Sequence, residues 1–126
     1  MSISSTQVKV AIIDDHALMR NCLFNCLSIW GYDVIIAAAN TNDFLNQISE
    51  DNLPAICIIE INMPFPGGYE TIYILRHNWP SIKIVVYSLN IEFGKPGRLN
   101  GADAVISKFD HVTLLKTTLS QLSGLK

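Results

Sequence analysis

Apolar and polar residues alternate along the chain in blocks of two kinds. Short, almost fully apolar runs are typical of buried strands, whereas longer stretches with an apolar residue every three or four positions are typical of amphipathic helices. The apolar runs predict five strands, at residues 8–13, 33–37, 55–60, 82–87 and 104–107. The amphipathic stretches predict helices at residues 18–30, 41–48, 69–79 and 112–122. The chain therefore alternates strand and helix almost throughout.

Turn-forming residues mark the ends of these elements. Gly31 follows the first helix at a C-cap position, and we expect Thr41 to begin the second helix as its N-cap. Residues 92–101 contain three glycines and one proline. Inside a helix each glycine costs about 1 kcal/mol and a proline about 3 kcal/mol. A full helix is therefore not expected there, and the prediction is one short, irregular turn that begins at Pro96 and ends at Gly101.

Repeated strand–helix units predict an α/β fold. Parallel strands need crossover connections, and right-handed crossovers place helices on both faces of the sheet. For five strands we predict a parallel sheet of order 2-1-3-4-5, in the (βα)5 three-layer sandwich of flavodoxin-like proteins. The run at residues 55–60 is apolar on both faces, as a central strand of such a sheet requires. The length of 126 residues predicts a single domain, 1–126, with its core within residues 8–122.

Composition excludes several classes of protein and function. With 49% hydrophobic and 16% charged residues, the chain is globular rather than disordered. Its net charge of −2 argues against nucleic-acid binding by this chain, which needs a basic surface. No signal peptide and no membrane-spanning run are visible. The three cysteines are expected to be free thiols in the cytoplasm, with Cys22 and Cys26 in the core.

Candidate chemistry gathers at the carboxyl edge of the predicted sheet. Asp14 and Asp15 follow the first strand, Glu60 ends the third, Ser88 ends the fourth and Lys108 follows the fifth. Neighbouring carboxylates repel one another, so a cation is needed. The two candidates are Mg²⁺, which prefers oxygen ligands, and the ammonium group of Lys108. Taken singly, the acids could be helix caps or solvated strand ends, but taken together they favour a site at the switch point of the sheet.

Several motifs occur in an order that resembles one signalling family. They are Ile12-Ile-Asp-Asp-His16, Glu60-Ile-Asn-Met-Pro64 with Gly68, Val86-Tyr-Ser88, and Gly101-Ala-Asp-Ala-Val-Ile-Ser-Lys108. The ordered set resembles the receiver domain of two-component response regulators, and the likeness runs from Val8 to Leu122. The Asp-Asp-His and Gly-Ala-Asp segments, and the lack of proline after Lys108, are most similar to the subfamily with a C-terminal helix-turn-helix domain.

The resemblance implies a mechanism of phosphoryl transfer. In this family a histidine kinase donates a phosphoryl group to an aspartate at the end of the third strand, beside bound Mg²⁺. Carried over to this sequence, the metal ligands are Asp14, Asp15, Glu60 and the backbone carbonyl of Asn62. The residues that bind the phosphoryl oxygens are Ser88 and Lys108. The implied partners are a histidine kinase or another signalling protein, and an attached DNA-binding output domain outside this chain that controls transcription.

The sequence departs from the family at the phosphoacceptor position, where Glu60 stands in place of aspartate. Phosphoryl transfer depends on positioning, so one extra methylene is a serious displacement. Glu60 either mimics the phosphorylated state, or leaves an unphosphorylated domain that serves as a partner surface, or still accepts phosphate slowly. The first two hypotheses rank equally and above the third. Mg²⁺ binding is expected to be weakened or absent if Glu60 pairs with Lys108.

Further departures also suggest signalling that does not depend on phosphorylation. Val105 occupies the position of a switch aromatic residue that moves inward on activation, and Leu89 replaces a residue that is usually small. We therefore expect an interaction module and not an enzyme. The alternative is a small phosphatase or phosphotransferase of the haloacid-dehalogenase type that uses Asp14, but such an enzyme needs a second aspartate where His16 stands. A flavin-binding protein is disfavoured because acidic residues after the first strand repel phosphate.

Overall fold

The computed structural model describes residues 7–89 and 101–124, which form five strands and four helices. In chain order these are β1 (Lys9–Ile13), α1 (Ala17–Ile29), β2 (Asp33–Ala38), α2 (Thr41–Gln47), β3 (Ile56–Ile59), α3 (Gly68–Asn78), β4 (Lys83–Ser88), β5 (Ala104–Ser107) and α4 (Val112–Leu122). The turn predicted at residues 92–101 falls outside the described residues except for Gly101. Among the described residues, no helix has the length and apolar character needed to cross a bilayer.

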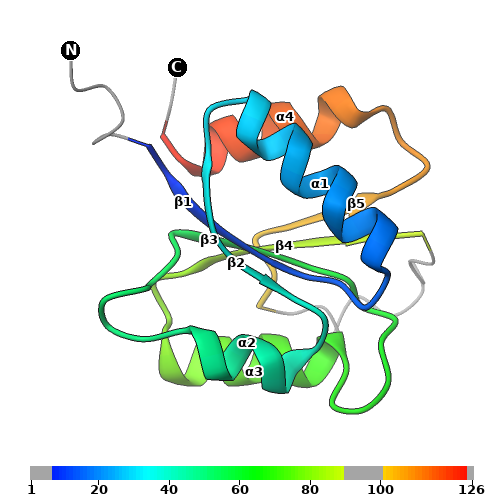
Figure 1. Ribbon diagram of the computed structural model, residues 1–126. Helices are drawn as coiled ribbons and strands as arrows, with labels where there is room; N and C mark the ends of the chain where they lie inside the picture. Colours follow the sequence, from blue (N-terminus) through cyan, green and yellow to red (C-terminus); the bar gives the residue numbers. More distant parts are fainter. Residues whose placement is uncertain (1–6, 90–100, 125–126) are drawn as a thin grey trace.

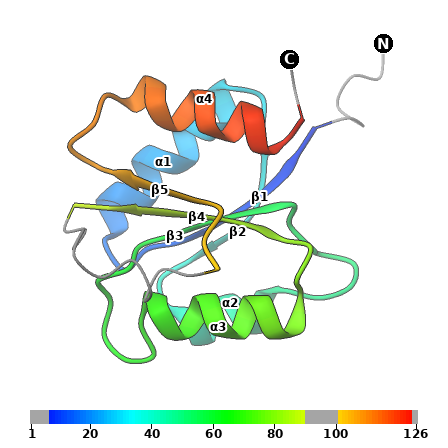
Figure 2. The ribbon, with the colours of Figure 1, turned by 180° about the vertical axis from the view of Figure 1, so that it is seen from behind.

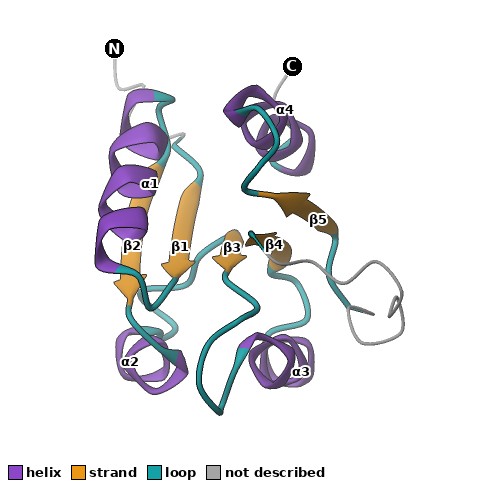
Figure 3. Cartoon of the chain, turned by 90° about the vertical axis from the view of Figure 1, so that its right-hand side faces the viewer, coloured by secondary structure: helices purple, strands orange, loops and turns teal. Residues whose placement is uncertain are grey.

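The five strands form one parallel sheet of order β2-β1-β3-β4-β5, which confirms the predicted fold class. Helices α1 and α4 cover one face of this sheet, and α2 and α3 cover the other (Figures 1 and 2). Figure 3 shows the three layers end on, with the strands in the predicted order. The carboxyl ends of β1 and β3 are neighbours, and the chain leaves them for helices on opposite faces, so the switch point lies between them.

Two apolar clusters hold the layers together, one on each face of the sheet. Ala11 of β1 belongs to the cluster that contains Phe44 of α2, and Ile12 belongs to the cluster with Leu27 of α1 and Leu119 of α4. Successive strand residues point to opposite faces, so one strand serves both clusters. All four residues of β3 are buried, which confirms its prediction as a central strand.

The end of α1 agrees with the sequence prediction, whereas the residue that caps the start of α2 does not. Gly31 adopts a φ of +94°, a left-handed conformation that favours glycine, directly after the C-cap of α1. The expectation that Thr41 caps α2 is wrong, because the cap is Asn40, whose Oδ1 accepts a hydrogen bond from the Asp43 N–H at 2.8 Å. Thr41 is instead buried, and its hydroxyl lies 2.6 Å from that of Thr71 on α3. The Thr41 hydroxyl, which a cap would need, therefore forms a tertiary hydrogen bond with Thr71 instead.

The cysteines occupy three different environments. Cys57 lies on β3 and is fully buried, and burial raises the pKa of its thiol. Cys26 is half-buried, but Cys22 is exposed, so the expectation of a core position is wrong for Cys22. Leu23 is the next residue and faces the core, and a step of one residue turns a helical side chain by about a quarter turn. Cys22 therefore lies on the outer side of α1.

Candidate functional site

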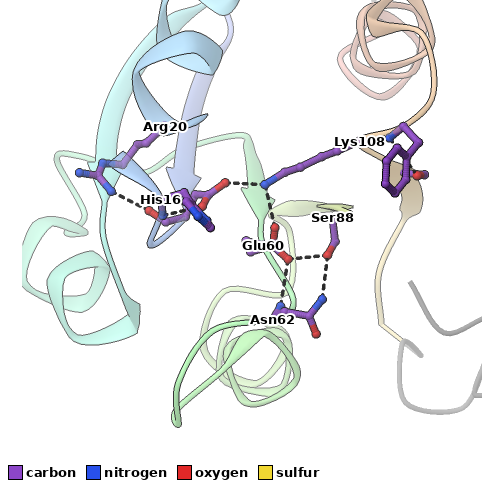
Figure 4. Close-up of polar contacts among 9 residues, drawn as sticks. His16, Arg20, Glu60, Asn62, Ser88 and Lys108 are labelled. Carbon is purple, nitrogen blue, oxygen red and sulfur yellow. Dashed lines mark hydrogen bonds and ion pairs between the residues drawn. The ribbon is translucent and has the colours of Figure 1, made fainter. Parts of the chain in front are cut away.

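The predicted site residues lie together at the carboxyl edge of the sheet (Figure 4). Asp14 directly follows β1, Glu60 follows β3, Ser88 ends β4 and Lys108 follows β5. The Glu60 N–H donates to the Ile13 carbonyl and the Lys108 N–H to the Ser88 carbonyl, each at 2.9 Å. The ladder of the sheet thus extends one residue beyond the strands. This pairing fixes the backbone from which the functional side chains project.

The ammonium group of Lys108 lies between two carboxylates. Its Nζ is 2.8 Å from Asp14 Oδ2 and 2.7 Å from Glu60 Oε1, and each of the three side chains is at most 7% exposed. Burial alone would lower the pKa of Lys108, but the hydrogen bonds and charges of Asp14 and Glu60 outweigh burial, so the pKa of Lys108 is raised. The ring of Tyr87 lies 5.7 Å from Nζ. Lys108 is therefore an internal cation of this acidic edge.

Both oxygens of the Glu60 carboxylate have protein donors. Oε1 accepts from Lys108, whereas Oε2 accepts from Ser88 Oγ at 2.5 Å and from the Asn62 N–H at 3.0 Å. The side-chain amide of Asn62 donates to Ser88 Oγ at 3.2 Å, which leaves the hydroxyl proton directed to Glu60. Glu60 is buried, so the interpretation of it as a solvated strand end is wrong.

The two acids that follow β1 differ in their surroundings. Asp14 is buried, and its Oδ1 accepts from the His16 N–H at 2.9 Å. Asp15 and His16 are exposed, and His16 is the residue before α1 but makes no side-chain cap. Asp14, Asp15 and His16 each offer an atom that can bind a metal, and these atoms all lie within 4.8 Å of one another. The structure thus groups His16 with the two acids and directs Glu60 toward Lys108.

The expected three-carboxylate set does not fit Mg²⁺ in this arrangement. The oxygens of Asp14 and Asp15 suit the ion chemically. However, both Glu60 oxygens already accept hydrogen bonds, and Asp14 Oδ2 is already paired with an ammonium group. In the described structure the ammonium group of Lys108 balances the charges of the two buried carboxylates.

Arg20 on α1 is a second cation at this edge that the sequence analysis did not single out. Its Nη1 donates to the backbone carbonyl of Asp14 at 2.7 Å (Figure 4). Arg20 stands four residues after His16, one turn into the helix that begins at the site. The contact joins residues six positions apart across the start of the helix, so the i,i+4 spacing of a helix gives no signal for it. The side-chain contact of Asn62 with Ser88 also has no signal in the sequence, because the two residues lie on different segments.

The start of α3 approaches the end of β3 very closely. A Cβ atom at Gly68 would lie 2.5 Å from Ile61 Cα and 2.9 Å from the Glu60 carbonyl oxygen, so only glycine fits there. The first turn of α3 is fixed further by Glu70, whose Oε1 accepts from the Gly67 N–H at 2.8 Å. This contact restrains the backbone that carries Glu60.

A pocket of about 250 Å³ opens beside these groups. Its walls include Met19 and Leu89, with Glu60 and Lys108 among the polar lining residues. Leu89, one of the predicted departures, thus borders the site directly. Val105 lies on β5, is 39% exposed and is not among the lining residues.

A five-stranded parallel sheet of this order, with polar groups at its switch point, defines the class of doubly wound α/β proteins that use the carboxyl edge for function. Within that class, residues 10–119 match the family model of the response regulator receiver domain. The chain belongs to this family of two-component signalling domains, as its motifs predicted.

Individual relatives agree with the family. The chain is 33% identical over 98 residues to the response regulator GacA of Pseudomonas aeruginosa, and the matched segment covers 77% of this chain and 45% of GacA. It is 25% identical over 88 residues to the transcriptional regulatory protein DegU of Brevibacillus brevis, and the matched segment covers 70% of this chain and 37% of DegU. The chain therefore spans less than half the length of these relatives. The structure of the response regulator TrrA of Thermotoga maritima, in complex with Mg²⁺–BeF, superposes with a TM-score of 0.83 at 22% identity, covering 92% of this chain and 99% of TrrA.

Proposed function

We propose that this chain is a receiver module that signals without phosphoryl transfer, with the Glu60 carboxylate in place of a phosphoryl group. One observation carries the proposal: Glu60 contacts Lys108 Nζ at 2.7 Å through one oxygen and Ser88 Oγ at 2.5 Å through the other. By resemblance, Lys108 and Ser88 are the residues that bind phosphoryl oxygens. In this chain a permanent anion already occupies the position between them.

The same contacts disfavour Glu60 as a phosphoacceptor. Attack on a phosphorus atom needs a carboxylate oxygen in line with the leaving group. Oε1 would first have to leave Lys108, and Oε2 would have to leave Ser88 and the backbone of Asn62. Hydrogen bonds with a charged partner are stronger than neutral ones, so this release is costly. Acceptance of phosphate by Glu60 is therefore expected to be slow or absent.

The rim of the site supports a role as a surface for a protein partner. Leu18 of α1 is 75% exposed, Phe65 in the loop before α3 is 85% exposed, and Phe109 directly after Lys108 is 82% exposed. All three stand at the carboxyl edge of the sheet, where the acidic site lies. Large apolar side chains at such a rim favour burial against another protein. We propose a histidine kinase or another cytoplasmic signalling protein as the partner.

We also propose that the output is control of transcription through a DNA-binding domain beyond this chain. The support is that the relatives GacA and DegU are regulators more than twice the length matched here. A Mg²⁺ ion, present with BeF in TrrA, is proposed to bind this chain weakly or not at all. The dehalogenase-type alternative gains no support, because both oxygens of Asp14 are held by Lys108 and the His16 N–H.

The test is an intact-mass measurement after incubation with a small phosphodonor and Mg²⁺. The natural chain should stay unmodified, and Glu60→Asp should gain one phosphoryl group, because Asp14, Ser88 and Lys108 are unchanged. If the natural chain gains a phosphoryl group that Glu60→Gln abolishes, Glu60 is an acceptor and the proposal is wrong. If Glu60→Asp also stays unmodified, the matching of Ser88 and Lys108 to phosphoryl-binding residues is wrong.

A second measurement separates the mimic from a merely inert domain. Amide chemical shifts of Glu60→Asp should be recorded with and without beryllium fluoride and Mg²⁺. If Glu60 mimics the phosphorylated state, residues of β4 and β5 in the natural chain should resemble the treated variant. Resemblance to the untreated variant would leave only the partner-surface role.

A further inference from the structure

Strand β5, which leads into Lys108, is fixed less by apolar packing than its neighbours. It lies at one edge of the sheet and pairs only with β4 among the strands that the structure describes (Figure 3). One of its four residues, Ile106, is buried, whereas all four residues of β3 and five of the six in β4 are buried. Burial of one face normally fixes the register of a strand, so apolar packing specifies the register of β5 weakly.

The position of the Lys108 ammonium group depends on this register. Lys108 directly follows β5, and its Nζ reaches across β4 to Glu60 at 2.7 Å and to Asp14 at 2.8 Å. A slip of one residue moves a strand by about 3.3 Å and turns its side chains to the other face of the sheet. Such a slip would separate Nζ from both carboxylates. The site therefore needs contacts other than apolar packing to hold β5 in place.

A pair of hydrogen bonds joins the start of β5 to β4. Asp103 directly precedes β5, and its N–H donates to the Ile84 carbonyl at 2.8 Å, while its Oδ2 accepts from the Ile84 N–H at 2.7 Å. Since Val85 pairs with Ala104, a continued parallel ladder would lead the Ile84 N–H to the Gly101 carbonyl instead. Ile84 is fully buried, so its N–H needs an acceptor. The Asp103 side chain supplies this acceptor in the observed register.

Arg76 on α3 joins the start of β5 to the start of β4. Its Nη2 forms an ion pair with Asp103 Oδ2, and its Nε donates to the Gly101 carbonyl at 2.6 Å. Its Nη1 donates to the carbonyl of Ile82, directly before β4, at 2.6 Å. The planar guanidinium group has several donors in a fixed geometry, which suits such a set of acceptors. One side chain thus fixes the beginnings of two neighbouring strands relative to each other.

We propose that Arg76 and Asp103 are positioning residues for the functional site, because they set the register of β5 and thereby place the ammonium group of Lys108 between Asp14 and Glu60. The four residues of β5 separate Asp103 from Lys108, so the pair acts through the strand and not by direct contact. The inference deepens the function proposed above and rests on it, since that function needs Lys108 beside Glu60. Its test reads the position of Lys108, and its failure is therefore distinguishable from failure of that function.

The experiment measures the nuclear Overhauser effect between the ε-methylene protons of Lys108 and the γ-methylene protons of Glu60 in the complete, isotopically labelled chain. The natural chain should show this effect, because the two charged groups are in contact. Arg76→Met and Asp103→Ala, made separately, should both lose it, together with the effects between backbone protons of β4 and β5. The two variants remove opposite sides of one ion pair, so either of them tests the proposal if the other does not fold. Circular dichroism establishes which variants are folded.

Two matched controls separate positioning from general loosening of the fold. Asn78→Ala alters α3 two residues after Arg76, at a side chain that donates to the Ile74 carbonyl of the same helix at 2.9 Å. Asn52→Ala removes a hydrogen bond to the Gln47 carbonyl, also 2.9 Å long, in the segment between α2 and β3. Both controls should keep the Overhauser effect. Equal loss in a control, or an unchanged effect in a folded test variant, would overturn the proposal.

A second readout is the rate of phosphoryl transfer from a small phosphodonor to Glu60→Asp, followed by intact mass. Adding Asp103→Ala should slow this rate at least about tenfold, since a displacement of about 1 Å at a reacting centre can cost about 100-fold. An unchanged rate would overturn the proposal. Phosphorylation of the natural chain at Glu60 would instead refute the function proposed above, and loss of the Overhauser effect in the test variants would still support the positioning role.

Discussion

Removal of the internal cation should destabilise the domain strongly, and a second substitution should then restore part of the loss. In Lys108→Met, the carboxylates of Asp14 and Glu60 stay buried, at most 7% exposed, without their shared ammonium group. Removing one partner from a buried ion pair costs about 3–5 kcal/mol. Glu60→Gln alone should cost less, about 1–3 kcal/mol, because Lys108 keeps Asp14 at 2.8 Å and the amide oxygen still accepts one hydrogen bond.

The double variant Lys108→Met/Glu60→Gln decides between charge pairing and simple packing. It holds one buried carboxylate without a cation instead of two, so it should be more stable than Lys108→Met by about 1–2 kcal/mol. The assay is equilibrium unfolding in urea. With a slope of about 1.5 kcal/mol per molar, a loss of about 3–5 kcal/mol moves the midpoint by roughly 2–3 M. Lys116→Met, on the exposed side of α4, is the control and should stay within about 0.5 kcal/mol of the natural chain.

One result would refute this reasoning directly. If the losses of unfolding free energy in Lys108→Met and Glu60→Gln simply add in the double variant, the Glu60 carboxylate destabilises the fold no more without Lys108 than with it. The site would then be held by packing and not by charge. Added Mg²⁺ provides an independent check, because a divalent cation should stabilise Lys108→Met more than the natural chain once the competing ammonium group is gone.

Three further predictions concern the same charges and one remote contact. Mg²⁺ should leave the unfolding free energy of the natural chain nearly unchanged and raise that of Glu60→Asp; equal stabilisation of both in urea titrations would show that Glu60 does not displace the metal. The pKa of Lys108, which the charges of Asp14 and Glu60 raise, should fall in Glu60→Gln in lysine ¹³Cε NMR titrations. Because folding raises the pKa of Lys108, the stability that its charge contributes is present below the unfolded pKa of about 10.4. This stability is lost as pH rises through the folded pKa. Arg76→Met should destabilise the domain by about 2–3 kcal/mol in urea unfolding, because the guanidinium group bonds three backbone carbonyls and Asp103; a change below about 0.5 kcal/mol, as for an ordinary surface residue, would contradict this.

The site could be located from sequence because strand ends are easy to place. An apolar run such as residues 55–60 is needed wherever helices cover both faces of a strand, so its end is well defined. In a parallel sheet all such ends meet at one edge, and this brings Asp14, Glu60, Ser88 and Lys108 together without any knowledge of contacts. The replacement of the family's aspartate by Glu60 could also be recognised without a structure, because it is a difference in residue type alone.

The choice between the two candidate cations could not be made from sequence. Mg²⁺ and Lys108 both suit an acidic edge, and the decision depends on whether Nζ reaches Asp14 and Glu60, residues 94 and 48 positions away. Side-chain reach across strands has no periodic signal. The cap of α2 was missed for the same reason, since Thr41 is drawn inward by Thr71, 30 residues later.

The order of the elements, the edge of the sheet at which the polar residues collect and the chemical type of each of these residues can all be read from the chain alone. These properties follow from local hydrophobic periodicity and from the single way in which strand–helix units wind. That both oxygens of Glu60 accept hydrogen bonds, and that Lys108 balances two carboxylates, becomes known only from the packed fold. Those outcomes depend on distances between segments remote in the chain, which the packing of the whole sheet sets.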